Sequence, residues 1–266
     1  MRLVSFDALR TLGMPGVRYL KPELMFRERD YLSSQIDWAL FPEYWQVNAL
    51  SYGLSVRIFP SMASYHLGHN KIEQTRLFEL LCPANTPLTL ILPNTPASRE
   101  QILEQFTFPF VAKEPKNSMG YGVFLIESHS DFSHYYQQND VLYIQEFLPI
   151  DRDMRVVLIG DQVVGGYWRS GEGFHNNVSQ GGQVIHGPIP EEARQLVEYI
   201  AHQTGINHAG FDIAMVGNHC YLLEFNRLFG NQGVMSMGID SSSLILDYLA
   251  RQSTPPSDPP VLELVV

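Results

Sequence analysis

Two short segments near the C-terminus, residues 211–216 and 221–225, alternate apolar and polar residues, and a Gly–Asn pair lies between them. This pattern is typical of a β-hairpin. The hairpin carries Asp212 and Glu224, and Asn226 follows. Because side chains alternate across a strand, Glu224 and Asn226 are expected on one face. The chain must therefore fold around a sheet that holds oxygen-bearing side chains among apolar strands.

The length of the hairpin loop decides whether the acidic side chains meet. A two-residue loop would leave Asp212 and Glu224 on opposite faces. A three-residue loop at residues 217–219 would pair Val216 with Cys220 and place Asp212 directly opposite Glu224. A shared site for the two carboxylates therefore requires the second register or an equivalent bulge.

The hairpin offers two carboxylates and a carboxamide, and Mg²⁺ prefers such hard oxygen ligands. The alternative interpretation is a solvent-facing acidic row. The neighbours Ile213 and Leu222 are apolar, and acids embedded among apolar residues are costly unless they are paired or metal-bound. Two close carboxylates also repel unless a cation lies between them. The sequence therefore predicts a Mg²⁺ site formed by Asp212, Glu224 and Asn226.

Charge and composition restrict the partners. The 28 Asp and Glu residues outnumber the 18 Lys and Arg residues, so the surface repels a phosphate backbone and no nucleic-acid partner is expected. The net negative charge does not exclude a local basic pocket that binds a small anion. No apolar run approaches the roughly 18 residues that span a bilayer, so no membrane partner is expected. Two isolated cysteines, Cys82 and Cys220, fit a reducing compartment, and a cytoplasmic protein is expected.

The expected elements divide the 266 residues into several parts. Residues 1–84 alternate short apolar strands with helical patterns, which favours a small α/β lobe with a partly parallel sheet. Residues 85–148 have the pattern of a strand, a loop, a second strand, a helix and a third strand, which predicts a compact antiparallel unit. Residues 149–252 contain the most regular helix pattern, at 191–202, and the hairpin. Residues 253–266 are proline-rich and read as an extended tail. The predicted class is mixed α/β (α+β).

The helical pattern of residues 69–81 also predicts which side chains are buried. Ile72 and Leu80 belong to its apolar positions, whereas Lys71 and Gln74 are left for the other faces. The pattern therefore predicts that the apolar positions pack against the core.

A lysine ends the apolar strand at residues 109–113, and a loop with Gly120 and Gly122 follows. Lys113 can neutralise phosphate oxygens there, while loop amides approach a ligand closely. The alternative is a strand-end lysine beside an ordinary hairpin. The loop matches neither a P-loop nor a Rossmann fingerprint.

Two further polar segments carry less specific signals. Glu146 ends a strand before an extended hinge at residues 147–149, whose backbone groups could bind the edge of a purine. A solvated strand end is the alternative. The glycine-rich residues 171–182 follow Arg169 and read as a long functional loop, with disorder as the alternative.

The order of these residues along the chain resembles the ATP-grasp superfamily. Within it, the chain is most similar to the ribosomal-S6 glutamate-ligase-like (RimK-like) branch. The similarity covers roughly residues 54–233, and its segments are HNKIEQTRLFELL, VAKEPKNSMGYGV, YIQEFLPIDRDMRVVLIGDQVV, FHNNVSQGG and AGFDIAMVGNHCYLLEFN. It implies the ATP-grasp fold, in which a small N-terminal lobe precedes two α+β subdomains that clasp ATP.

The resemblance also implies a role for each matching residue. Two lysines and the glycine flap would contact the phosphates, Glu146 and the following backbone would hold adenine, and Asp153 would hold the ribose. Asp212, Glu224 and Asn226 would hold two Mg²⁺, with Mn²⁺ as an alternative. The residues assigned to the nucleotide are Lys71, Lys113, Ser118, Gly120, Gly122, Glu146, Phe147, Leu148, Asp153, His175, Asn176 and Asn177.

The activity that the resemblance implies is a two-step ligation. A substrate carboxylate attacks the γ-phosphorus of ATP, and an amine then displaces phosphate from the acyl phosphate. Arg155 and Arg169 would face the transferring phosphoryl and acyl groups as catalytic residues. The alternatives are a kinase on the same scaffold and a nucleotide-binding protein without turnover.

The partners that the resemblance implies are ATP, a small-molecule carboxylate and an amine, or a peptide or protein tail. After Asn226 the family usually has small residues and a proline, whereas residues 227–230 here read Arg-Leu-Phe-Gly. That segment borders the acceptor site. The sequence therefore leaves the acid, the amine and the oligomeric state open.

Overall fold

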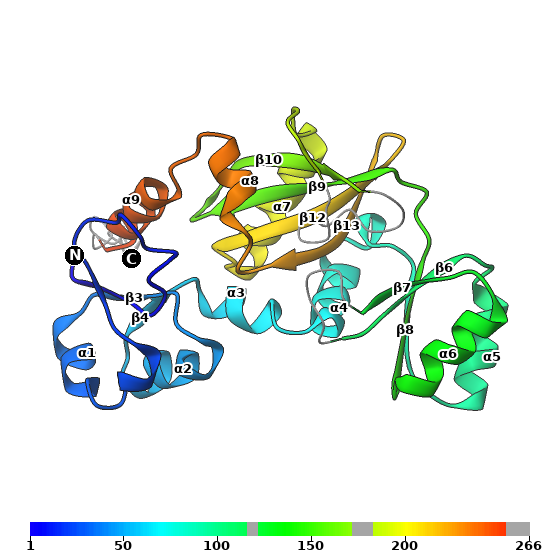
Figure 1. Ribbon diagram of the computed structural model, residues 1–266, viewed down its shortest axis with the longest axis horizontal. Coiled ribbons are helices and arrows are strands. Elements are labelled where there is room, and N and C mark those ends of the chain that lie inside the picture. Colours follow the sequence, from blue (N-terminus) through cyan, green and yellow to red (C-terminus); the bar gives the residue numbers. More distant parts are fainter. Residues whose placement is uncertain (116–121, 172–182, 254–266) are drawn as a thin grey trace, which may run out of the picture. The chain divides into compact units, whose positions relative to one another are not determined.

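The computed structural model describes residues 1–115, 122–171 and 183–253 (Figure 1). The chain divides into two compact units, one formed by Met1–Pro60 with the residues from Asp240 onward, and one formed by Ser61–Ile239. The first unit thus ends at Pro60 rather than at residue 84. It also includes the C-terminal helix, which is distant in sequence. None of the helices in the described segments is both long and apolar enough to cross a bilayer.

The first unit is built on a four-stranded sheet, the N-terminal sheet, with strand order β2-β1-β3-β4. All its strand pairs are parallel, which confirms the α/β prediction for this lobe. Its strands are β1 (Leu3–Ser5), β2 (Val17–Tyr19), β3 (Trp38–Leu40) and β4 (Arg57–Phe59). Its helices are η1 (Pro22–Leu24), α1 (Arg29–Gln35), α2 (Tyr44–Asn48), η2 (Ala49–Gly53) and α9 (Ser241–Ser253).

Hydrogen bonds attach α9 to the N-terminal sheet. The Trp38 indole donates to Ser253 Oγ at 3.0 Å, and Arg57 donates to the Gln252 carbonyl at 3.1 Å. Because Trp38 and Arg57 begin β3 and β4, the end of α9 is anchored at the amino ends of these two strands.

The second unit contains two antiparallel sheets. The small sheet has the order β5-β8-β6-β7, and its strand pairs are antiparallel, as the sequence predicted for this segment. Its core is aromatic and aliphatic, and in it Phe110 and Ile144 of the sheet are buried together with Ile102 of α5 and Phe132 of α6. Its elements are β5 (Thr89–Pro93), α5 (Pro96–Gln105), β6 (Phe110–Lys113), β7 (Val123–Ile126), α6 (His129–Gln138) and β8 (Val141–Glu146).

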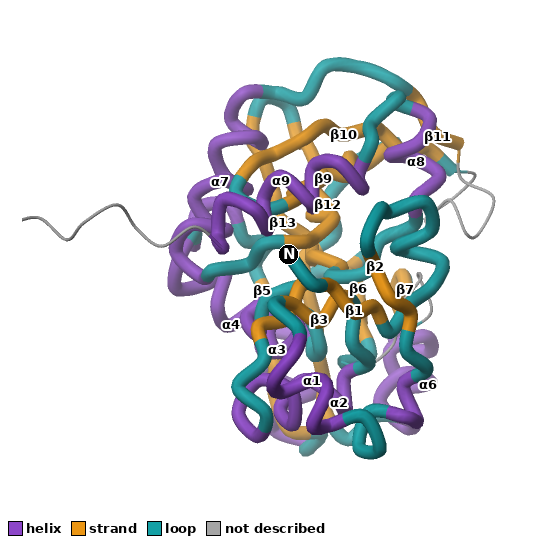
Figure 2. Tube along the Cα trace, turned by 90° about the vertical axis from the view of Figure 1, so that its left-hand side faces the viewer, coloured by secondary structure: helices purple, strands orange, loops and turns teal. Residues whose placement is uncertain are grey.

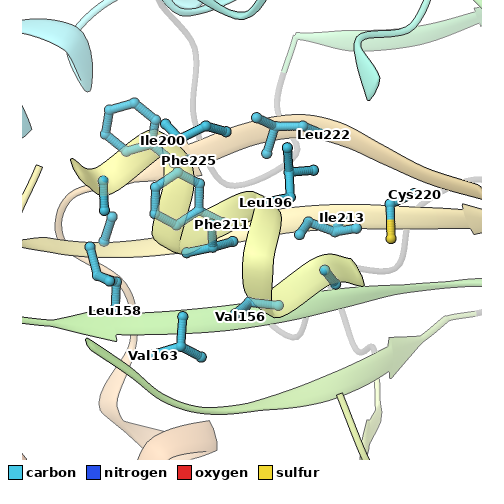
Figure 3. Packing of buried hydrophobic residues seen from close by; sticks show 14 of the residues in the cluster. Val156, Leu158, Val163, Leu196, Ile200, Phe211, Ile213, Cys220, Leu222 and Phe225 are labelled. Atoms are coloured by element: carbon cyan, nitrogen blue, oxygen red, sulfur yellow. The ribbon is translucent and has the colours of Figure 1, made fainter. Parts of the chain in front are cut away.

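The large sheet has the order β11-β10-β9-β12-β13, and all its pairs are antiparallel. Figure 2 shows α7 and α8 on opposite sides of these strands. Leu196 and Ile200 of α7 pack on Phe211, Leu222 and Phe225 (Figure 3). The elements are β9 (Arg152–Ile159), β10 (Gln162–Ser170), β11 (Gln183–Ile185), α7 (Glu191–Thr204), β12 (His208–Val216), β13 (His219–Asn226) and α8 (Asn231–Ser236).

Helices α3 (Met62–Leu67) and α4 (Lys71–Leu81) and the turn η3 (Pro83–Asn85) precede the small sheet. The inner face of α4 differs from the expected one. Gln74 is buried, whereas Leu80 is 82% exposed. Polar partners on β13 and β8, described below, select this face, and the apolar pattern alone could not reveal them. The prediction that Gln74 faces away from the core is therefore wrong.

Candidate active site

The β12–β13 hairpin brings Asp212 and Glu224 together by a bulge. Val216 pairs with His219, so the loop has two residues. The register shifts between Asp212 and Ile213, where Leu223 is the additional residue of β13, and Asp212 then lies opposite Glu224. The predicted opposition is confirmed, and it is reached by the bulge rather than by the three-residue loop, the two arrangements that the sequence left open. The bulge absorbs one residue, which would otherwise turn Glu224 to the other face.

One face of the large sheet is apolar and the other is charged. Met154 and Val156 of β9 join the core beneath α7. Asp153 and Arg155 alternate with them and therefore point to the opposite face. Asp212 pairs with Arg155 across β9 and β12, which places it on that same face. We call this surface the charged face, and define it by Asp153, Arg155, Arg169, Asp212, Glu224 and Asn226.

Ion pairs cross the strands of the charged face. Arg155 donates from Nε and Nη2 to the two Asp212 oxygens, both at 2.7 Å. Arg169 donates to the two Asp153 oxygens at 2.7 and 2.9 Å, and its Nη2 lies 3.2 Å from Asp212 Oδ2. Bidentate pairs of this kind fix both side chains in place. The two arginines therefore share Asp212 and are held in fixed orientations.

These ion pairs also set protonation. Burial acts to raise the pKa of Asp212, but Arg155 and Arg169 outweigh it and hold the pKa below its ordinary value. Burial acts to lower the pKa of Arg169, and Asp212 and Asp153 outweigh that effect and raise it. Asp212 is therefore an anion and Arg169 a cation at neutral pH.

Glu224 has a lysine partner. Lys71, the first residue of α4, places Nζ 2.8 Å from Glu224 Oε2. Burial acts to raise the pKa of Glu224, but Lys71 and Lys113 outweigh burial and the nearby Asp212 charge, so the pKa lies below its ordinary value. The Asn226 amide donates weakly to Asp212 Oδ2 at 3.5 Å and to Glu224 Oε1 at 3.4 Å. Protein cations therefore neutralise the two carboxylates here, where the sequence alone suggested a metal ion.

Lys113 ends β6 and is buried, not a solvated strand-end residue. Burial lowers its pKa from 10.5 to about 8, against the attraction of Glu224. Its ammonium lies 5.6 Å from the centre of the Tyr143 ring. Tyr135 donates a hydrogen bond to the Lys113 carbonyl at 2.8 Å, which holds the backbone. A buried ammonium with a lowered pKa at the end of a strand is a candidate anion-binding group.

Glu146 occupies the hinge after the small sheet. Its Oε1 accepts from the Leu88 amide at 2.7 Å, and its own amide donates to the Leu88 carbonyl at 2.9 Å. The Leu148 carbonyl accepts from the Ile150 amide at 2.9 Å, so the hinge turns there. These contacts hold Glu146 against the start of β5, and Phe147 and Leu148 follow it into the turn.

The glycine-loop residues are described only in part. Gly122 closes the β6–β7 connection, since its carbonyl accepts from the Glu114 amide at 2.7 Å and its φ is +72°, a backbone conformation that favours glycine. Five nucleotide-binding predictions lie outside the described residues: Ser118, Gly120, His175, Asn176 and Asn177.

One residue that shapes the charged face, Gly210, was not among the predicted site residues. Gly210 lies two residues before Asp212 on β12, and a Cβ there would approach Arg155 Cδ to 2.9 Å and Phe229 Cβ to 3.1 Å. Its missing side chain leaves room for the stem of Arg155, whose guanidinium pairs with Asp212 on the same strand as Gly210. The period of two that assigns Asp212 to this face also assigns Gly210 to it, and this signal was available in the sequence.

In the described segments, no group of three or more His, Cys, Asp or Glu side chains is placed to hold a metal ion. A divalent cation at the charged face would therefore rely on Asp212, Glu224, the Asn226 amide oxygen and ligands from outside the protein. Mg²⁺ commonly binds in this way, with one or two carboxylates and substrate phosphates.

Solved structures with the same fold identify its class. A RimK-domain ATP-grasp protein from Sphaerobacter thermophilus covers 93% of this chain and 99% of its own, with a TM-score of 0.69 at 14% identity. D-alanine–D-alanine ligase from Bacillus anthracis, complexed with ATP, covers 95% of this chain and 98% of its own, with a TM-score of 0.69 at 13% identity. The fold is the ATP-grasp fold, as predicted.

The family follows from the sequence. A model of the RimK-like ATP-grasp domain matches residues 72–249, two thirds of the chain. The chain therefore belongs to the RimK-like ATP-grasp family, which confirms the resemblance.

Curated relatives are glutamate ligases and related synthases. The coenzyme γ-F420-2:α-L-glutamate ligase of Methanocaldococcus jannaschii is 28% identical over 151 residues, 54% of this chain and 52% of the relative. Human N-acetylaspartylglutamate synthase A is 27% identical over 154 residues, 54% of this chain and 39% of the relative. The chain thus spans about half or less of the length of these two relatives.

Proposed function

We propose that this chain is an ATP-dependent carboxylate–amine ligase that forms an amide through an acyl phosphate and releases ADP and phosphate. The observation that carries the proposal is the charged face, on which Asp212 lies opposite Glu224 while arginines and a lysine surround both. Membership in the RimK-like family and the names of the curated relatives support the same chemistry.

The charged face fits Mg²⁺ by its donor set. Asp212 and Glu224 are ionised and adjacent, and Asn226 can present its amide oxygen if the carboxamide turns over. In the protein alone, Lys71 and the two arginines already neutralise the carboxylates. Two Mg²⁺, or Mn²⁺ in their place, would neutralise the phosphates and polarise the γ-phosphoryl group. We infer that Lys71 then exchanges Glu224 for a nucleotide phosphate.

The nucleotide site combines two lysines with the hinge. Lys113 would bind phosphate oxygens from its buried position at the end of β6, where a charge-assisted hydrogen bond is strong. Glu146 and the backbone at Phe147 and Leu148 would receive the adenine. Ser118, Gly120 and Gly122 of the flap and His175, Asn176 and Asn177 of the second glycine loop are proposed to cover the triphosphate.

Arg155 and Arg169 are proposed as the catalytic residues. Both lie on the charged face beside Asp212, and their guanidinium groups are fixed by bidentate pairs. Such preorganised donors stabilise charge that develops on the phosphoryl and acyl oxygens. The resemblance implies that Asp153 holds the ribose, and in the protein alone both of its oxygens accept hydrogen bonds from Arg169. We propose that orienting Arg169 is its main role.

For the substrates, we propose a small-molecule carboxylate or a peptide or protein tail as the acid, and an α-amino acid as the amine. L-glutamate is the first amine to test, because several relatives are named as α-L-glutamate ligases. We also place the protein in the cytoplasm, since Cys82 and Cys220 are free thiols.

Trapping with hydroxylamine tests the proposal. The wild-type protein is incubated with ATP, Mg²⁺ and a panel of carboxylic acids, and hydroxylamine is added in place of the amine. A ligase yields ADP and a hydroxamate in equal amounts, both detected by mass spectrometry, and Glu224→Gln yields neither. ADP formation with a phosphorylated hydroxyl compound and no hydroxamate would establish the kinase alternative instead.

A further inference from the structure

The buried face of α4 contains a carboxamide that contacts the edge of the large sheet. Gln74 Nε2 donates to the Phe225 carbonyl at 3.2 Å, and its Oε1 accepts from the Phe225 amide at 3.0 Å. Gln74 is 5% exposed. Strand β13 is the last strand in the order of this sheet, so Gln74 supplies the pair of hydrogen bonds that a further strand would supply.

The residue that Gln74 binds lies between two proposed metal ligands. Phe225 separates Glu224 from Asn226, so its backbone position sets the spacing of both side chains. Lys71 precedes Gln74 by about one helical turn and shares its face of α4. Its Nζ contacts Glu224 at 2.8 Å. The Gln74 carboxamide therefore fixes the first turn of α4 against β13, the strand whose Glu224 is contacted by Lys71.

The adjacent residue connects α4 to the other sheet. Thr75 forms a hydrogen bond with the Tyr143 hydroxyl, and both groups are buried. Tyr143 is the register partner of Lys113 in the small sheet, and its ring lies beside the Lys113 ammonium. Helix α4 is therefore attached to β13 through Gln74 and to β8 through Thr75.

We propose that Gln74 is a positioning residue that holds Lys71 in register with Glu224 and Asn226. This inference rests on the proposed function of these three residues. A carboxamide suits the task because it presents a donor and an acceptor side by side, as a backbone amide does. Methionine at this position has similar length and makes neither bond. Glutamate accepts from the Phe225 amide but cannot donate to its carbonyl.

The test compares Gln74→Met, Gln74→Glu and the control Glu73→Met. Glu73 is the preceding residue on α4, and its side chain is exposed. Three quantities are measured: hydrogen exchange of the Phe225 amide by NMR, the Mn²⁺ dissociation constant by electron paramagnetic resonance, and the Mg²⁺ dependence of turnover. Thermal unfolding monitors the fold of each variant.

We expect the effects of Gln74→Met to be concentrated in β13, the strand that contains the proposed metal ligands Glu224 and Asn226. In Gln74→Met the Phe225 amide exchanges at least about tenfold faster and the Mn²⁺ dissociation constant rises about tenfold. Gln74→Glu keeps the amide protected and restores part of the metal affinity. Glu73→Met matches the wild type. If exchange and metal affinity change only in proportion to global stability, or equally in both Gln74 variants, the positioning role is overturned.

The proposed function can fail separately. If wild-type protein forms no hydroxamate with any acid, the ligase activity is wrong, but exchange at Phe225 and Mn²⁺ binding still report on Gln74. If hydroxamate forms normally in Gln74→Met at limiting Mg²⁺, the ligase stands and the positioning role does not.

Discussion

Asp212 and Glu224 lie directly opposite each other on the charged face because Leu223 is accommodated in a bulge of β13. The two-residue loop of the hairpin would otherwise place Leu223 opposite Asp212 and turn Glu224 toward the side that α7 covers. Bulges recur where a side chain must be re-aimed next to an active site. One additional residue in β13 therefore joins the two carboxylates on which the proposed metal site depends.

Glu224→Gln is expected to leave the fold intact and to abolish Mg²⁺-dependent turnover. The substitution keeps the shape of the side chain and an acceptor for Lys71, but it removes the charge that a divalent cation requires. We expect hydroxamate formation to fall by orders of magnitude with little change in the melting temperature. Asp247→Gln on α9, in the first unit, is the control. Normal turnover of Glu224→Gln at ordinary Mg²⁺ would show that Glu224 is not a metal ligand.

Lys113→Met is expected to lose nucleotide affinity while gaining stability at neutral pH. The folded pKa of Lys113 is about 8, below the ordinary 10.5, so burial of its charged form opposes folding below pH 8. As the pH rises from about 8 to 10.5, the folded protein releases this proton before the unfolded chain does. The unfolding free energy of the wild type therefore increases relative to that of Lys113→Met over this pH range.

Two measurements check this expectation. Urea unfolding at pH 7, 8, 9 and 10 should show the stability advantage of Lys113→Met shrinking as the pH rises. Calorimetry at pH 7 should show ATP binding weakened by roughly ten- to a hundredfold, as for a lost hydrogen bond to a charged group. A stability difference that stays constant with pH would contradict the lowered pKa. Unchanged ATP affinity would remove Lys113 from the nucleotide site.

Local patterns predicted the β12–β13 hairpin and its polar residues Asp212, Glu224 and Asn226. The arginines of the charged face were assigned only through the resemblance to the ATP-grasp superfamily. Alternation assigned Glu224 and Asn226 to one face, and acids among apolar neighbours indicated a site. The partners of these residues were not encoded locally. Arg155 and Asp212 are 57 positions apart, and only the pairing of β9 with β12 brings them together. The cations that neutralise the carboxylates therefore became visible only in the folded chain.

Helix α4 shows the limit of periodicity most directly. An apolar stripe predicted a face that includes Leu80, and the protein buries Gln74 and Thr75 instead. Each of these polar groups has a hydrogen-bond partner on a strand far along the chain, so burial costs little. Periodicity counts apolar residues and cannot register such partners.

Asp153→Asn separates two roles for Asp153. If Asp153 orients Arg169, the variant should lower kcat by about a hundredfold, as small misplacements of catalytic groups do, with ATP affinity changed less than threefold. If Asp153 binds the ribose, ATP affinity should fall, and the preference for ATP over 2′-deoxy-ATP should shrink. Calorimetry with both nucleotides and steady-state kinetics decide between the two roles. Asp151→Asn, in the adjoining segment, is the control.

Gly210→Ala is expected to disable the charged face without touching any charged residue. The new Cβ would approach Arg155 Cδ to 2.9 Å and Phe229 Cβ to 3.1 Å, so the Arg155 stem must move and its bidentate pair with Asp212 must loosen. We expect kcat to fall by about ten- to a hundredfold, while ATP affinity is retained. Gly53→Ala, in the first unit, is the matched control, because a Cβ at Gly53 meets nothing within 4 Å. A crystal structure of Gly210→Ala should show Arg155 displaced from Asp212. Full activity together with an unmoved Arg155 would show that this strand has room for a side chain and that Gly210 does not position the arginine.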